Sequence, residues 1–233
     1  MLPRSEAEGG QVDVVVDLWL WPLGQDPGDG PLSPAERARA ARFLRPADAV
    51  AYRAAHAGLR AILGAVTGTD PAALAFQTTA QGKPVLPGGP AFNLSHAGGW
   101  AALAVAPVAV GVDIEAHRPV EPEVAARFFS AAEQAALAPL AGGAWRQAFF
   151  RIWTRKEAFV KALGVGLSHP LDSFDVTAGA SAQLVRHATG RAADWALIDL
   201  PLGTGWAGAV AVQTGGRPAR IVLRAGAMPL PGH

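Results

Sequence analysis

Val108-Ala109-Val110-Gly111-Val112-Asp113-Ile114-Glu115 has the alternation of a β-strand with two unlike faces. Side chains in a strand point alternately to opposite sides, so the even positions 108 to 114 form an apolar face, and Asp113 and Glu115 share the other. Two carboxylates one pleat apart repel each other unless a cation lies between them, and such pairs suit a hard ion such as magnesium. The alternative is a solvated strand end.

A second acidic residue lies in a predicted helix over 144–163. Its apolar residues recur at intervals of three, four and seven and form a core-facing stripe, comprising Phe149, Phe150, Trp153, Val160 and Leu163. Glu157 falls inside this stripe, where a carboxylate is costly unless it is paired or binds a metal. Lys161, one turn later, offers the simpler alternative of a helix ion pair worth about 0.2–0.5 kcal/mol.

Between 92 and 99 a strand runs into a glycine-rich turn, Phe92-Asn93-Leu94-Ser95-His96-Ala97-Gly98-Gly99. The hydroxyl of Ser95 and the imidazole of His96 can donate hydrogen bonds to a phosphate there. The alternative is an ordinary turn whose polar side chains are satisfied locally. A Gly-x-Ser-x-Gly motif that would favour a hydrolase is absent from the sequence.

The remaining elements are predicted from alternation, periodicity and turn residues. Val12 to Trp21 reads as a strand, and Ser33-Pro34-Ala35-Glu36 as the start of helices that fill much of 34–65. We expect further helices over 121–139 and strands near 173–176, 195–200 and 206–213. The first helical region carries arginines that form either a phosphate site or a solvated face, namely Arg37, Arg39, Arg42, Arg45, Arg53 and Arg60.

Composition excludes several classes of function. Of the 233 residues half are hydrophobic, which is enough for one large domain or two small ones. The net charge of +1 argues against a surface that coats nucleic acid or anionic membrane. The absence of cysteine excludes disulfides and thiolate metal sites, and makes a cytoplasmic location the default. Residues 1–11 lack the pattern of a secretory signal, and the apolar run 100–112 is too short to span a membrane.

Taken in order, several segments together resemble the surfactin-type 4'-phosphopantetheinyl transferases. The resemblance covers about 82–175, with weaker similarity over 34–65. Its most specific feature is a Gly-Val-Asp-x-Glu followed about 40 residues later by Trp-x-x-Lys-Glu-Ala-x-x-Lys. The segments are Gly82-Lys83-Pro84, Phe92-Asn93-Leu94-Ser95-His96, Gly111-Val112-Asp113-Ile114-Glu115, Arg127-Phe128-Phe129-Ser130 and Trp153 through Gly164.

The resemblance implies an α+β fold: a pseudo-two-fold monomer of two similar halves, with the active site in the cleft between them. Residues 1–108 would form the half that holds the nucleotide end of coenzyme A. Residues 109–233 would carry the metal carboxylates, the catalytic helix and a docking surface for the carrier protein near Phe128 and Phe129. The alternative for these two phenylalanines is a place in the core.

The resemblance also implies a role for each site residue. Asp113, Glu115 and Glu157 would hold a magnesium ion that also binds the pyrophosphate of coenzyme A. Glu157 would take the proton of the carrier serine, and Lys161 would steady the phosphate charge. Lys83, Ser95, His96 and Arg53, with Arg60 as a further candidate, would line the nucleotide end of the site.

The implied reaction transfers the 4'-phosphopantetheine arm of coenzyme A to a serine of an apo acyl or peptidyl carrier protein and releases adenosine 3',5'-bisphosphate. Three alternatives remain: a coenzyme A binding protein without transferase activity, a magnesium-dependent pyrophosphohydrolase, and a structural protein with solvated carboxylates. The pairing of Glu157 with Lys161 favours transfer, because mere binding needs neither a base nor a charge clamp. The sequence leaves open the carrier, the tolerance for acylated coenzyme A and the arginines that bind the 3'-phosphate.

Overall fold

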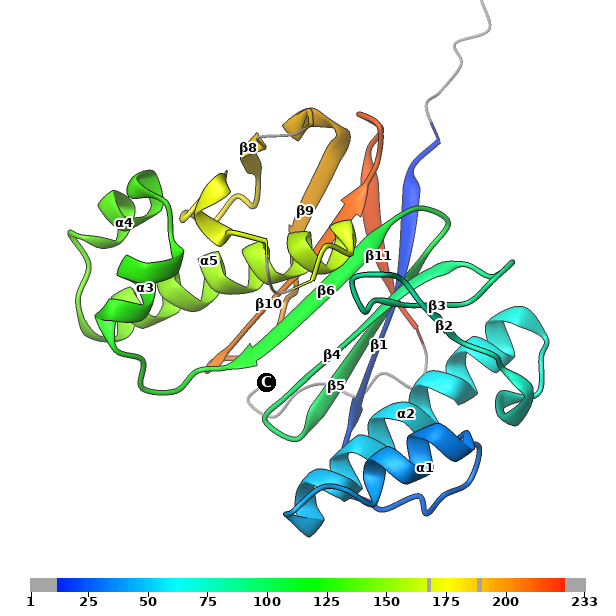
Figure 1. Ribbon diagram of the computed structural model, residues 1–233. Helices are drawn as coiled ribbons and strands as arrows, with labels where there is room; N and C mark the ends of the chain where they lie inside the picture. The colour runs from blue at the N-terminus through cyan, green and yellow to red at the C-terminus, as the bar shows by residue number, and fades with distance from the viewer. Residues whose placement is uncertain (1–11, 167–168, 188–189, 225–233) are drawn as a thin grey trace, which may run out of the picture.

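The computed structural model describes residues 12–166, 169–187 and 190–224. Figure 1 shows strands in the middle of the molecule and the two long helices, α2 and α5, on opposite sides of them. The helices are α1 (Pro34–Ala40), α2 (Pro46–Thr67), α3 (Pro122–Phe128), α4 (Ala131–Leu137) and α5 (Gly142–Leu163), with short 3-10 turns η1 (Pro71–Ala73), η2 (Leu171–Ser173) and η3 (Ala192–Asp194). No helix among the described residues has the length and apolar run needed to cross a membrane.

The strands form two larger sheets and two small hairpins. One sheet has the order β11-β1-β5-β4, the other the order β6-β10-β9, and β2 pairs with β3 and β7 with β8. The strands are β1 (Val14–Pro22), β2 (Gln77–Thr78), β3 (Pro84–Val85), β4 (Ala91–Ala97), β5 (Trp100–Ala106), β6 (Val110–Ala116), β7 (Phe174–Val176), β8 (Leu184–His187), β9 (Trp195–Asp199), β10 (Trp206–Gln213) and β11 (Ala219–Leu223). Helices and sheets in one chain confirm the α+β class.

Each of the larger sheets packs against one long helix. Leu59 and Leu63 of α2 form a buried cluster with residues of β4 and β5. Ala158 and Phe159 of α5 are buried in a cluster that includes β10. The even positions of β6 face away from α5 and are buried with β1 and β5. The apolar face predicted for 108–114 is therefore confirmed, and it joins the two sheets.

The two sheets also meet along a seam between β4 and β6, where side chains take the place of a backbone ladder. Asn93 Oδ1 accepts a hydrogen bond from the amide of Val112 at 2.8 Å, and Ser95 Oγ accepts one from the amide of Ile114 at 3.3 Å. Alternation along β4 points both side chains to the same side, so one strand can hold the other at two successive pleats. The seam brings Ser95 next to the acidic face of β6.

Gly111 lets α5 lie directly on β6. A Cβ atom at this position would stand 2.1 Å from the carbonyl oxygen of Ala158 and 2.4 Å from the amide nitrogen of Ala162. Both are backbone atoms, which cannot turn aside as a side chain can. Gly111 shares the face of Asp113 and Glu115, so the close approach places α5 over these carboxylates.

The predicted elements are largely confirmed, with breaks that follow from capping. The helical region 34–65 is divided by residues 41–45, and its start has the predicted capping box, in which Ser33 and Glu36 satisfy each other's amides. The predicted helix 121–139 is two helices, because Ser130 caps α4 through a second capping box with Glu133. A helix that starts at 131 leaves Phe129 in extended backbone between the two.

Two expectations for the second half change. The division at residue 108 stays a prediction, but β11 returns to the first sheet and runs parallel to β1, so residues after 108 contribute to both sheets. Phe129 is 2% exposed and belongs to the core, which removes it from any docking surface. Phe128 is half-buried and packs edge-on against Trp153.

Glu36 ties α1 to α2. Beyond the cap, its carboxylate accepts a hydrogen bond from Arg60 Nε at 2.7 Å and lies 3.1 Å from His56 Nδ1. Arg60, 2% exposed, also donates to the carbonyl oxygens of Pro71 and Leu74. Burial would raise the pKa of Glu36, but the bonds from His56, the Ser33 amide and Arg60 outweigh it and hold the pKa at about 2.

Gly111→Ala is expected to lower the free energy of unfolding by roughly 1–3 kcal/mol, because α5 must move away from β6 to admit the methyl group. Urea unfolding measures this loss. The control is Gly143→Ala in the first turn of α5, where a Cβ meets nothing within 4 Å. Equal stability of the two variants would contradict the close approach at Gly111.

Glu36→Gln is expected to cost roughly 1–2 kcal/mol of stability at neutral pH, less than the full equivalent of a pKa held at about 2 instead of 4.5, because the carboxylate is partly screened by solvent. Since the folded pKa is depressed, this stability is present above pH 4.5 and is lost as the pH falls towards 2. Urea unfolding at a series of pH values should show the loss for the parent protein and a flatter profile for the variant. Asp26→Asn, at an exposed pair with Arg53, is the control and should change stability little.

Candidate active site

Asp113 is the centre of the polar groups between β6, β4 and α5. The residue is 5% exposed, and its Oδ1 accepts hydrogen bonds from Lys161 Nζ at 2.6 Å and from Ser95 Oγ at 3.0 Å. Lys161 Nζ also lies 3.2 Å from Ser95 Oγ, so the three side chains form a closed triangle. Oδ2 of Asp113 is buried and has no hydrogen-bond partner among the described residues.

Glu157 lies one helical turn before Lys161, and the charges of both carboxylates of β6 affect its pKa. Burial raises its pKa, the charges of Asp113 and Glu115 raise it further, and the Lys161 ammonium opposes them. Burial likewise raises the pKa of Asp113, against the opposing charge and hydrogen bond of Lys161. Both pKa shifts arise mainly from burial, and a cation placed between the acids would lower both pKa values again.

Glu115 stands at the half-buried edge of the group. Its Oε2 accepts a hydrogen bond from Arg118 Nη1 at 2.6 Å. Within the described ranges, no three acidic or histidine side chains are gathered closely enough to hold a metal ion as they stand. The shared magnesium site of Asp113, Glu115 and Glu157 therefore stays a prediction. The unpartnered Oδ2 of Asp113 and the raised pKa values fit such an ion.

The predicted nucleotide-end residues lie in different surroundings. Ser95 is buried against Asp113, and His96, the next residue, is exposed. Partial desolvation lowers the pKa of His96, and the positive charges of Lys161 and His56 lower it further. His96 therefore lies within electrostatic reach of both α2 and α5.

The two candidate arginines already have acidic partners. Arg53 forms a two-pronged pair with Asp26, in which Nε lies 2.8 Å from Oδ1 and Nη2 bonds Oδ2. Arg60 is buried against Glu36, which removes it as a phosphate ligand. The side chains of Arg39, Arg42 and Arg45 are exposed around the α1–α2 connection.

Lys83 reaches from the β2–β3 hairpin across to the second half. Its ammonium donates to the carbonyl oxygens of Lys161 at 2.7 Å, Val110 at 3.0 Å and Ala162 at 3.2 Å. Burial lowers its pKa to about 8. Lys83 thus contacts the backbone beside the acidic cluster. The sequence had predicted that it contacts the nucleotide instead.

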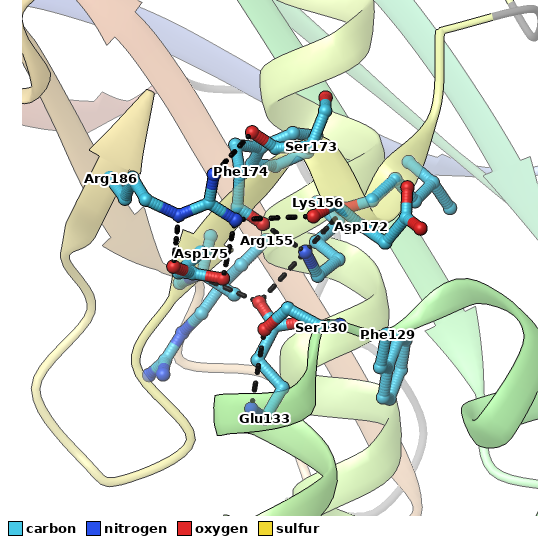
Figure 2. A network of polar contacts seen from close by, with 12 residues as sticks. Phe129, Ser130, Glu133, Arg155, Lys156, Asp172, Ser173, Phe174, Asp175 and Arg186 are labelled. Carbon is cyan, nitrogen blue, oxygen red and sulfur yellow. Dashed lines mark hydrogen bonds and ion pairs between the residues drawn. The ribbon is translucent and has the colours of Figure 1, made fainter. Parts of the chain in front are cut away.

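Sequence reasoning missed two buried cations on α5. Figure 2 shows Lys156, which donates to the carbonyl oxygens of Leu171 and Phe174 and pairs with Glu133 at 2.8 Å. Glu133 also accepts from the amides of Ser130 and Val176. Arg155, fully buried, pairs with Asp199 of β9. The only sequence signal for the first network was the Ser130-x-x-Glu133 capping box, which does not reveal Lys156.

These two networks hold the residues directly before Glu157 on α5. Lys156 links α5 to the chain at Leu171 and Phe174, which follows the helix. Arg155 links α5 to Asp199 of β9, the edge strand of the second sheet. Burial lowers the pKa of Lys156, and the charge of Glu133 opposes that shift. Loss of either partner would leave a buried charge uncompensated, so the helix cannot easily turn about its axis.

The chain is similar to known 4'-phosphopantetheinyl transferases. Residues 109–211 match the model of the 4'-phosphopantetheinyl transferase superfamily. The 4'-phosphopantetheinyl transferase HetI of Nostoc sp. is 37% identical over 166 residues, which are 66% of this chain and 70% of HetI. The 4'-phosphopantetheinyl transferase ffp of Bacillus subtilis is 34% identical over 160 residues, 66% of this chain and 71% of its own length.

The 4'-phosphopantetheinyl transferase Sfp of Bacillus subtilis (strain 168) is 35% identical over 147 residues. That match spans 62% of this chain and 66% of Sfp, just under two thirds of its length. The matched superfamily segment contains β6 and α5, and hence all three acidic candidates. The chain belongs to the 4'-phosphopantetheinyl transferases of the Sfp type.

Proposed function

We propose that the protein transfers the 4'-phosphopantetheine arm of coenzyme A to a serine of an apo carrier protein, with magnesium. The observation that carries this proposal is the contact of Lys161 with the buried Asp113, with Glu157 one turn away on the same helix. Asp113 comes from β6, and Glu157 and Lys161 come from α5. Gly111 allows these two elements to lie in close contact. Family membership supplies the substrates.

Asp113, Glu115 and Glu157 would hold the magnesium ion. When bound, the ion neutralises charge on the pyrophosphate oxygens of coenzyme A. Oδ2 of Asp113, buried and without a hydrogen-bond partner among the described residues, is suited to be a ligand. Ser95 and Lys161 keep Oδ1 of the same carboxylate fixed.

Glu157 acts as the general base, directly or through a water molecule. It accepts the proton of the carrier serine as the serine oxygen bonds to the phosphorus that bears the pantetheine arm. The bond from this phosphorus to the bridging oxygen breaks, and adenosine 3',5'-bisphosphate leaves. A pKa raised by burial and by neighbouring acids makes Glu157 a better proton acceptor, and one positioned base is worth about 10²–10⁴-fold.

Lys161 balances the phosphate charge during transfer. Its ammonium has contacts with Asp113 and Ser95 and extends from the same face of α5 as Glu157. A cation at this position can stabilise the negative charge that develops on the phosphoryl oxygens. Because Lys161 and Glu157 are four residues apart on one helix, the base and the charge clamp stay in fixed relation.

The nucleotide would extend towards the first half of the molecule. Ser95, His96 and Arg53 are proposed to line that end, and the two halves to be related by a pseudo-two-fold axis with the site in a cleft between them. Lys83 is an exception, because its ammonium already has three acceptors. For the carrier protein we propose docking on the second half near the half-buried Phe128, since Phe129 is inaccessible.

The two rival activities keep the same groups but differ in products. A coenzyme A binding protein would leave its ligand intact, and a pyrophosphohydrolase would cleave it without a carrier. A base placed beside a separate charge clamp disfavours mere binding, because binding removes no proton, and the requirement for a carrier protein distinguishes transfer from hydrolysis.

Incubation with coenzyme A, magnesium and a panel of apo carrier proteins is expected to give at least one carrier heavier by one phosphopantetheine. Mass spectrometry of the carrier and detection of adenosine 3',5'-bisphosphate measure the outcome. Omission of the carrier separates transfer from hydrolysis, since transfer yields no bisphosphate without it. Carriers that all keep their mass would rule out the transferase.

Glu157→Gln is expected to lower kcat by about 10²–10⁴-fold while coenzyme A still binds, because the amide cannot accept the serine proton. Asp13→Asn, at an exposed acid just before β1 and away from the proposed carrier surface, is the control and should transfer normally. Asp113→Ala should impair transfer and raise the magnesium concentration needed for half-maximal rate. Normal turnover by Glu157→Gln would show that another group is the base.

A further inference from the structure

The Lys83 ammonium joins the two elements that carry the proposed active site. Lys161 and Ala162 lie in the last turn of α5, and Val110 is the first residue of β6. One charged group therefore binds the end of the catalytic helix and the beginning of the acidic strand at once. Lys83 itself lies 78 residues before Lys161, in the other half of the chain.

The acceptors are suited to an ammonium group. The last carbonyls of a helix have no partner within the helix and lie at the negative end of its dipole. An ammonium has three donors and no acceptor, and here each donor is matched to one carbonyl oxygen. In this arrangement no N–H of Lys83 is left over for a phosphate of coenzyme A.

The backbone on both sides is shaped for this contact. Gly164 ends α5 in the left-handed region with φ of 69°, and the Lys83 stem lies against it, since a Cβ at Gly164 would stand 3.0 Å from Lys83 Cδ. On the hairpin side, the Lys83 amide donates to Thr79 Oγ1 at 3.1 Å, and the Lys83 carbonyl accepts from the Thr79 amide at 2.9 Å. The hairpin thus presents Lys83 in a fixed direction.

We propose that Lys83 is a positioning residue: it holds the end of α5 on the start of β6 and so aligns Lys161 and Glu157 with Asp113. This role replaces the one at the nucleotide end of coenzyme A. The inference rests on the proposed transferase function, but the contact that it describes does not. A small shift of α5 at this end would move Lys161 away from Asp113, because the carbonyl that Lys83 holds belongs to Lys161 itself.

Lys83→Met keeps the aliphatic stem and removes the three donors. We expect kcat to fall by about 10–100-fold, since a displacement of about 1 Å at reacting groups costs on the order of 10²-fold. The dissociation constant of coenzyme A should stay within about twofold of the parent value. Amide hydrogen exchange in residues 161–164 should be about tenfold faster or more, with exchange in residues 146–152 unchanged. Arg191→Met, an exposed arginine at η3, controls for the lost charge.

Coenzyme A binding at least tenfold weaker in Lys83→Met, with normal kcat at saturation, would make Lys83 a substrate ligand and overturn the proposal. Unchanged exchange at the end of α5 would overturn it as well. Should Lys83→Met fail to fold, Lys83→Arg serves instead, because a planar guanidinium keeps the charge but cannot match three converging carbonyls.

A double-mutant cycle tests whether Lys83 acts through Lys161. The loss in kcat caused by Lys83→Met should largely disappear in a Lys161→Met background, where the aligned side chain is gone. Fully additive losses would contradict that route. If the parent protein transfers nothing, the proposed function fails, whereas hydrogen exchange and coenzyme A binding still decide the role of Lys83.

Discussion

The contact between the backbones of α5 and β6 at Gly111 is the constraint on which the site depends. With a hydrogen atom in place of a side chain there, the helix lies on the strand at a distance that no other residue would allow. The residues beyond Gly111 on the same face then meet the helix in order, so that Asp113 lies beneath Lys161. A strand pattern becomes a site only because the helix is this close.

Several buried polar contacts maintain that approach. Lys83 holds the end of α5, Lys156 and Arg155 secure its middle, and Asn93 and Ser95 fasten β6 to the first sheet. Buried charges of this kind are costly to separate from their partners, so they favour one arrangement over alternatives more than they add net stability. These contacts restrict the positions of Glu157 and Lys161, which suits the proposal that both groups meet a phosphate in a defined geometry.

Local sequence pattern was enough to predict several elements, though not all of those that depend on it. Alternation in 108–115 predicted the two faces of β6, and capping predicted the start of α1. The break at Phe129 followed the same rule but was missed, because Ser130-x-x-Glu133 was not read as a second cap. Lys83 could not be placed from sequence, since its three acceptors come together only after the two halves have docked. β11 was missed because a short strand after a glycine turn pairs with β1, some 200 residues earlier in the chain.

The most direct test of the account is a titration with Mn²⁺ in the presence of coenzyme A, followed by electron paramagnetic resonance. Mn²⁺ is a hard ion that replaces Mg²⁺ at oxygen ligands. Three acidic side chains that share one divalent ion predict one bound Mn²⁺ per chain, with affinity about 10–100-fold weaker in Asp113→Asn and in Glu157→Gln. If either variant bound Mn²⁺ as tightly as the parent protein, or if the parent protein bound no Mn²⁺, the shared site would be contradicted.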